Sequence, residues 1–259
     1  IIGGSLTGLV TAISLSKLNC TIDLITGDID KNLKSNRTIA ISENNLDFLN
    51  KLNISKLLKR EMWSCSIMKL YTEIKNKKFS EIFELNNENK REKILYMVEN
   101  SKIMKLMLSK IKQIKSISIK NQEKIYSIST SGLLKSVKFN NNVSKYNLVI
   151  ICTGYKSSLI KSIFNNEMIE NSYKESAVTA ILNHSSSKNN IVRQIFLKNA
   201  IFALLPISNT KTSIVWSVKH DMLKKNDVFL KKRIILYAKN YLKNVKFTTN
   251  LEYKNLNFL

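Results

Sequence analysis

A glycine-rich turn near the start of the chain is the feature most suggestive of chemistry. It lies between the apolar pair Ile1-Ile2 and the apolar run from Leu9 to Leu15. Residues without a side chain let the backbone approach a pyrophosphate closely, and the helix that follows points its partly positive N-terminus at the phosphates. This order of strand end, turn and helix is typical of a Rossmann-type βαβ unit. We therefore predict phosphate contacts at Gly3, Gly4, Ser5, Thr7 and Gly8.

Two further segments could contribute to the same site. Residues 21–26 are predicted to form the next strand, and Thr26 stands at its end, where a single hydroxyl would replace the carboxylate usual for a ribose. Later, the apolar run 148–151 leads into Thr153-Gly154. A continuous apolar strand that ends in a glycine turn is typical of a buried parallel strand at a ligand site.

Other kinds of active site have little support in the sequence. No Ser-His-Asp set or pair of catalytic carboxylates is evident, and His184 and His220 stand in polar, turn-like contexts that indicate a surface or structural role. Cys20, Cys65 and Cys152 are far apart and have no CxxC spacing, so we expect reduced thiols and no metal site.

Composition narrows the class of protein. With 259 residues, 44% of them hydrophobic, the chain can bury a sizeable core. The net charge of +23 comes from lysines spread along the whole chain, without the arginine rows that base recognition favours, so we exclude nucleic acid as a partner. A basic surface would instead favour contact with anionic lipid headgroups. No apolar run approaches the length of a membrane span.

The elements that would hold these residues can be predicted from periodicity. Ser42 is a predicted N-cap of a helix through Leu52, and two further helices are predicted over 99–114 and 225–242. Residues 67–85 alternate as antiparallel strands would. More strands are predicted at 117–119, 124–129, 134–139, 146–152, 177–183, 193–197, 200–206 and 212–218.

Several segments, taken in order, resemble one family: the FAD-dependent aromatic-ring monooxygenases of the p-hydroxybenzoate hydroxylase fold, and in particular their ubiquinone-biosynthesis branch. The similar segments are residues 1–9, 36–42, 96–100, 148–157, 173–180, 202–207 and 213–216. The resemblance implies an α/β fold in which a Rossmann-type FAD-binding domain, a parallel sheet with helices, is interleaved with a mixed or antiparallel substrate-domain sheet. The expected parts are 1–66 and 96–172 for FAD, and 67–95 and 173–259 for the substrate.

The chain departs from the family pattern at several places. Ser5 stands for the second glycine of the turn, Thr26 for the ribose-binding acid, Ser101 for an arginine and Thr153 for an aspartate. The family's third motif is absent and would follow Leu259, and only two residues precede the glycine turn. We therefore expect a chain cut at both ends, which on its own binds FAD weakly or not at all.

The resemblance also implies chemistry and partners. NAD(P)H would reduce FAD, and the reduced flavin would use O₂ to hydroxylate an aromatic ring of a polyprenylated ubiquinone precursor. Arg37 would pair with a cofactor phosphate, Thr153 and Gly154 would approach the cofactor, and Phe202 and Trp216 would face the substrate. The expected setting is a bacterial cytoplasm, with peripheral contact at the inner face of the membrane and with subunits of a quinone-biosynthesis complex.

Two alternatives stay open at this point. Thr26, Ser101 and Thr153 are compatible with a catalytically degenerate homologue that serves as an accessory or scaffold subunit. An NAD(P)-dependent dehydrogenase is disfavoured, because Thr26 lacks the carboxylate expected for an NAD ribose and no acid or base for a substrate is apparent.

Overall fold

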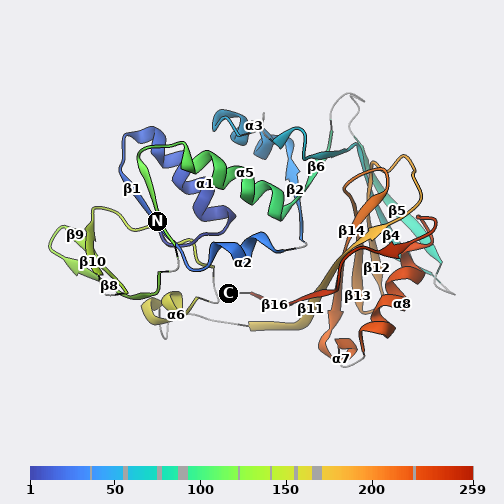
Figure 1. Ribbon diagram of the computed structural model, residues 1–259. Coiled ribbons are helices and arrows are strands. Elements are labelled where there is room, and N and C mark those ends of the chain that lie inside the picture. Colours follow the sequence, from blue (N-terminus) through green and yellow to red (C-terminus); the bar gives the residue numbers. More distant parts are fainter. Residues whose placement is uncertain are drawn as a thin grey trace.

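A computed structural model describes the chain except for residues 36, 55–57, 75–77, 87–92, 122, 141, 155–156, 165–170, 224–225 and 259. The described residues form two lobes that lie side by side (Figure 1). One lobe packs helices around short parallel strands, and the other is a large sheet with a helix against it.

The first lobe begins with the predicted strand, turn, helix and strand. Helix α1 (Leu6–Leu15) and the 3₁₀ turn η1 (Ser16–Leu18) lead to β1 (Ile22–Ile25), which pairs in parallel with β7 (Ile117–Lys120). Ile2 forms parallel bridges to Ile25 and to Ile151. The prediction of a longer strand over 146–152 is wrong, because Tyr146 ends an antiparallel hairpin strand and the parallel pairing is confined to the bridge at Ile151.

Helices and two small antiparallel sheets complete this lobe. The helices are α2 (Ile29–Leu33), α3 (Glu43–Lys51), α5 (Asn100–Lys112) and α6 (Ser158–Phe164). One sheet has the order β2 (Thr38–Ser42), β6 (Leu95–Glu99), β3 (Trp63–Cys65). The other has the order β10 (Asn142–Tyr146), β9 (Leu134–Phe139), β8 (Ile125–Ser131).

The second lobe is a mixed sheet of eight strands among the described residues. Its order is β15 (Lys246–Phe247), β11 (Asn171–Asn183), β14 (Lys211–Lys219), β13 (Ala200–Pro206), β12 (Ile191–Leu197), β4 (Ile67–Glu73), β5 (Phe79–Asn86), with β16 (Glu252–Phe258) also paired to β11. The strands predicted over 67–85 thus join a sheet formed mainly by residues beyond 170. Helices α7 (His220–Leu223) and α8 (Asp227–Ala238) follow β14. The parallel sheet with helices and the mixed sheet confirm the predicted fold class, whereas the domain boundaries remain a prediction.

Local sequence accounts for the helix starts. Ser42 caps α3 as predicted, because its Oγ accepts a hydrogen bond from Asn45 N (3.4 Å). Asn226 caps α8 in the same way, through a bond of 3.0 Å from Phe229 N. Helix α8 is therefore shorter than the predicted 225–242, and Lys225 lies outside the described residues.

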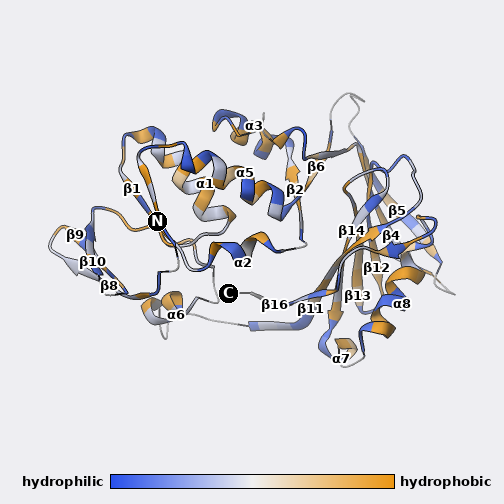
Figure 2. Ribbon diagram, in the orientation of Figure 1, coloured by the Kyte–Doolittle hydropathy of each residue, from blue (hydrophilic) through white to orange (hydrophobic). Residues whose placement is uncertain are grey.

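Hydrophobic residues gather on the faces that meet inside each lobe. In Figure 2 the start of β11 is hydrophilic and its later part is hydrophobic, and burial along the strand follows the same division. Helix α5 buries Ile103, Met104, Met107 and Ile111 against α1, so the methionine stripe belongs to the core.

Candidate functional site

The glycine turn has a backbone that requires glycine. Gly3 has φ +124°, a conformation that residues with a side chain rarely adopt, and a Cβ there would lie 2.5 Å from the carbonyl oxygen of Cys152. A Cβ on Gly8 would overlap the carbonyl oxygen of Gly3. These close approaches bring the turn, the start of α1 and the segment that carries Cys152 together.

The start of α1 is open to a ligand. Ser5 is the N-cap residue, yet its side chain makes no capping hydrogen bond. Its Oγ instead donates to the carbonyl oxygen of Cys152 (3.2 Å). This bond holds the side chain of Ser5, the residue that replaces the family glycine, against the segment of Cys152. Because first-turn amides of a helix have no partner within the helix, they can bind an anion at this end. Gly4 is buried beneath the turn, and Thr7 is exposed on the first turn of α1.

Predicted residues from three segments line one hollow of about 220 Å³, which we call the strand-end cavity. Its polar and glycine lining comes from Gly3, Thr26, Gly27, Glu123, Lys124, Thr153, Ser157 and Ser158. Thr153 Oγ1 is buried and has no hydrogen-bond partner among the described residues. Gly154, which follows it, has φ +76° and an exposed position. Tyr155 and Lys156 of the same motif lie outside the described residues.

Thr26 is already engaged within the protein. Its hydroxyl lies 2.9 Å from the carbonyl oxygen of Gly27 and 2.9 Å from Oδ1 of Asn121, the residue that follows β7. A hydroxyl has one hydrogen, so the Thr26 hydroxyl donates a hydrogen bond to one of these two acceptors. Its contact with a ribose stays a prediction.

Arg37 lies apart from the glycine turn. It lines a second hollow of about 380 Å³, here called the junction cavity, together with Thr38, Ala177, Thr179, Val215 and Tyr253. These residues come from the start of β2 and from one face of the large sheet. Ser35 Oγ accepts from both Arg37 N and Nε at 3.3 Å. Pairing of Arg37 with a cofactor phosphate stays a prediction.

Phe202 and Trp216 do not line the junction cavity. Both are fully buried on the sheet face that packs against α8, where their ring centroids lie 5.5 and 6.0 Å from that of Tyr237. Successive side chains of a strand point to opposite faces, so Val215 faces the junction cavity and Trp216 faces the core. Trp216 lines a separate hollow of about 220 Å³ with Met222 and Arg233. The expectation that the two aromatic residues face the substrate stays a prediction.

An ion pair fixes the strands beside the glycine turn. Asp23 on β1 accepts hydrogen bonds from Lys120 Nζ and from the Tyr146 hydroxyl, each at 2.7 Å. Burial alone would raise the pKa of Asp23, but these two bonds outweigh it and hold the pKa below its usual value. The pair thereby links β1, β7 and β10 next to the strand-end cavity.

Lys102 follows Ser101, which replaces the family's arginine, but it is held elsewhere. Its Nζ forms ion pairs at 3.0 Å with both Glu61 and Glu99. Burial alone would lower the pKa of Lys102, yet the two carboxylates raise it. Lys102 is thus part of a local charge network at the start of α5.

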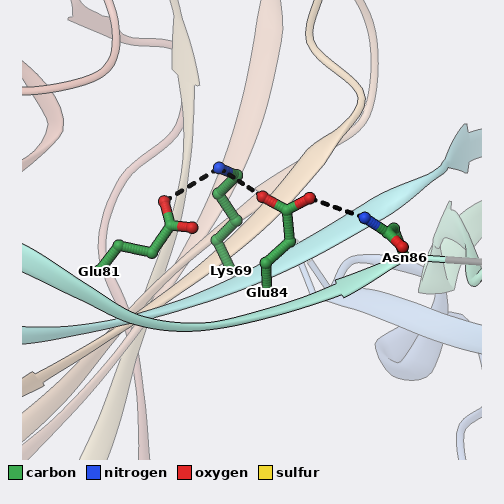
Figure 3. Close-up of polar contacts among 4 residues, drawn as sticks. All are labelled: Lys69, Glu81, Glu84 and Asn86. Carbon is green, nitrogen blue, oxygen red and sulfur yellow. Dashed lines mark hydrogen bonds and ion pairs between the residues drawn. The ribbon is translucent and has the colours of Figure 1, made fainter.

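A small charge cluster of the second lobe lies on the paired strands β4 and β5. Lys69 Nζ is 2.9 Å from Glu81 and 2.7 Å from Glu84, and Glu84 also accepts a bond of 2.8 Å from Asn86 (Figure 3). Hydrogen bonds from Lys69 and Asn86 lower the pKa of Glu84. Because these side chains are largely solvated, we interpret the cluster as a surface link between two strands.

Both histidines have structural contacts. His184 is buried, with Nδ1 2.9 Å from the carbonyl oxygen of Ser185 and Nε2 3.0 Å from Thr212 Oγ1. His220 Nε2 lies 3.1 Å from the carbonyl oxygen of Glu175. Within the described residues, no three or more His, Cys, Asp or Glu side chains gather as a metal ion would need. No described helix is both long and apolar enough to cross a membrane.

No protein-family model matches the chain, but sequence comparison finds relatives that all carry the same protein name. The mitochondrial ubiquinone biosynthesis monooxygenase COQ6 of Dictyostelium discoideum is 24% identical over 260 residues, covering 84% of this chain and 51% of the relative. Its counterpart from Danio rerio is 25% identical over 149 residues, covering 54% of this chain and 31% of the relative. The chain thus spans about half of the first of these proteins and about a third of the second. Both sources are eukaryotic, so they lend no support to the expected bacterial setting.

Structural comparison supports the fold over nearly the whole chain. The crystal structure of pqsL, a probable FAD-dependent monooxygenase from Pseudomonas aeruginosa, matches with a TM-score of 0.77 at 10% identity. The match covers 98% of this chain and 71% of that one. By sequence the chain is thus similar to the COQ6 ubiquinone biosynthesis monooxygenases, and in its fold it is similar to a probable FAD-dependent monooxygenase.

Proposed function

We propose that this chain is the FAD- and substrate-binding part of a monooxygenase that hydroxylates an aromatic ring of a polyprenylated ubiquinone precursor, with NAD(P)H and O₂ as co-substrates. The observation that carries the proposal is the Rossmann-type glycine turn, in which Gly3 lines the strand-end cavity and Ser5 leaves the start of α1 without a side-chain cap. The COQ6 relatives support the reaction class and the substrate class.

The residues present fit the adenosine and pyrophosphate half of FAD. The positive φ of Gly3 and the missing Cβ of Gly8 let the backbone of the turn pack closely against Cys152 and the start of α1, and the amides of the α1 start suit an anion. Thr153 Oγ1 is a buried hydroxyl without a partner among the described residues, as expected where a polar ligand completes the site. Ser5 turns its hydroxyl toward Cys152, so it is compatible with the phosphates.

The protein's own contribution is to bind and to orient. Bound FAD would supply the redox and oxygen chemistry, as cofactors do in such enzymes. The α1 start would hold the pyrophosphate, and Arg37 would add a cation that can pair with an anionic group at the junction cavity. The hydrophobic side chains of Ala177 and Val215 would shelter the substrate ring, because that cavity lies between the first lobe and the sheet.

The wider setting follows from the same proposal. A polyprenylated substrate resides in membranes, and the net charge of +23 would favour peripheral contact with anionic headgroups. We therefore place the protein in the cytoplasm or an equivalent compartment, at the inner face of a membrane, with subunits of a quinone-biosynthesis complex as further partners.

A catalytically degenerate accessory subunit is the second candidate. The internal use of the Thr26 hydroxyl favours it, because this residue offers a ribose less than the usual carboxylate does. The visible spectrum of the purified full-length protein separates the two. Flavin bands that NAD(P)H bleaches and air restores support the monooxygenase. A colourless protein that FAD does not stabilise contradicts it and favours the accessory subunit.

A further inference from the structure

The strand-end cavity holds an acidic side chain that sequence reasoning did not select. Oε2 of Glu123 is buried and has no hydrogen-bond partner among the described residues. A carboxylate only accepts hydrogen bonds, and a buried acceptor without a donor is costly. Glu123 and Thr153 both line this hollow of about 220 Å³, and each carries a buried polar atom without a hydrogen-bond partner among the described residues.

Glu123 stands next to the position where an acid is missing. The ends of β1 and β7 lie side by side in the parallel pair, and Glu123 N donates to the carbonyl oxygen of Thr26 (2.8 Å). Thr26 itself turns its hydroxyl toward Asn121 and Gly27. The carboxylate absent from the end of β1 is thus available just after the end of the neighbouring strand.

The lysine that lines the same cavity has another partner. Lys124, which also lines the cavity, places its Nζ 5.2 Å from the ring centroid of Tyr126. No ion pair of Glu123 is present among the described residues. We therefore expect the hydrogen-bond donor that pairs with the Glu123 carboxylate to be a neutral group of a ligand.

The position of the cavity indicates which donor this is. Gly3 lines it, so a pyrophosphate held at the α1 start would have its attached sugar within reach. The vicinal hydroxyls of a ribose offer two donors to one carboxylate, and the Thr153 hydroxyl can accept or donate beside them. We propose that Glu123 binds the ribose hydroxyls of the adenosine half of the cofactor, in place of the acid that Thr26 replaces. This inference rests on the proposed FAD site.

The test measures nucleotide affinity rather than turnover. Isothermal titration of the full-length protein with ADP and with 2′,3′-dideoxy-ADP should show about 10- to 100-fold weaker binding of the dideoxy nucleotide, the range of a lost charge-assisted hydrogen bond. In Glu123→Ala, ADP should weaken by about the same factor, while the dideoxy nucleotide binds as before. Glu81→Ala, which removes a glutamate from the distant β4–β5 hairpin, should leave both affinities unchanged.

The outcomes distinguish a failure of the role proposed for Glu123 from a failure of the proposed FAD site. If the unaltered protein binds FAD and ADP but does not distinguish ADP from its dideoxy analogue, the role of Glu123 is overturned and the proposed function stands. The role is equally overturned if inosine diphosphate, which lacks the adenine amino group, is the only analogue that binds weakly. If the unaltered protein binds neither FAD nor ADP, both proposals fall. The comparison of ligands on the unaltered protein needs no variant to fold.

Discussion

The glycine turn and the large sheet show two ways in which a chain fixes a shape. In the turn, backbone approaches backbone, and an added methyl group on Gly3 or Gly8 has no room. In the sheet, side chains fill the space, and Phe202, Trp216 and Tyr237 pack ring against ring. We therefore expect substitutions in the turn to lower both ligand affinity and stability, and substitutions in the aromatic cluster to lower mainly stability.

The largest effect should come from the aromatic cluster. Trp216→Ala removes a fully buried ring and should lower the free energy of unfolding by about 3–5 kcal/mol, measured by urea denaturation. Ile201→Ala is a matched control on β13, since Ile201 is 40% exposed beside the buried Phe202, and it should cost about 1 kcal/mol or less. Equal losses in the two variants would contradict the assignment of Trp216 to the core.

The glycine turn should respond in ligand affinity. Gly8→Ala forces a methyl group against the carbonyl oxygen of Gly3, so we expect a loss of about 1–3 kcal/mol in stability and at least about tenfold in ADP affinity. Gly27→Ala is the control for stability alone: its added methyl group meets no protein atom within 4 Å and should leave the free energy of unfolding unchanged, whereas Gly27 itself lines the strand-end cavity. A Gly8→Ala protein with unchanged ADP affinity would remove the turn from the site.

Asp23, on β1 beside the glycine turn, allows a test of how stability depends on pH. Its folded-state pKa is lowered, so its contribution is fully present above the unfolded value of 3.8 and is lost as the pH falls through the folded value. Asp23→Asn should therefore lower the free energy of unfolding by about 1 kcal/mol at pH 7. The difference from the unaltered protein should shrink in urea titrations below about pH 4. A difference that persists there would mean that charge is not its cause.

The smallest effect is expected on the surface of the sheet. Lys69→Gln removes the cation between Glu81 and Glu84, and we expect a change of no more than about 0.5 kcal/mol because the cluster is solvated. Urea denaturation with and without added salt would measure it. A loss comparable to that of Trp216→Ala would show that this cluster, rather than the aromatic core, holds the sheet.

Local patterns were enough to predict the elements but not all of their partners. The cap at Ser42 and the apolar stripe of α5 depend on residues a few positions apart, so the sequence shows them directly. Phe202 and Trp216 were placed in strands correctly, yet alternation alone does not reveal which face a helix will cover. That face depends on α8, which packs on the sheet through tertiary contacts.

The sequence was enough to predict the glycine turn, but it did not reveal which side chains lie beside it. The glycine spacing points to the turn because few other functions need so many residues without a Cβ. The partner of Thr26 is Asn121, 95 positions away, and only the parallel pairing of β1 with β7 brings them together. A signal for Glu123 was available, since an acid lost at one strand end can be replaced at the neighbouring strand end.

The flavin content of the purified full-length protein tests the central claim most directly, when measured beside Gly3→Ala. We predict about one FAD for each unaltered chain and a largely colourless variant, because the positive φ of Gly3 and its approach to Cys152 leave no room for a side chain. An unaltered protein without flavin, or equal flavin in both proteins, would contradict the assignment of the glycine turn to the cofactor.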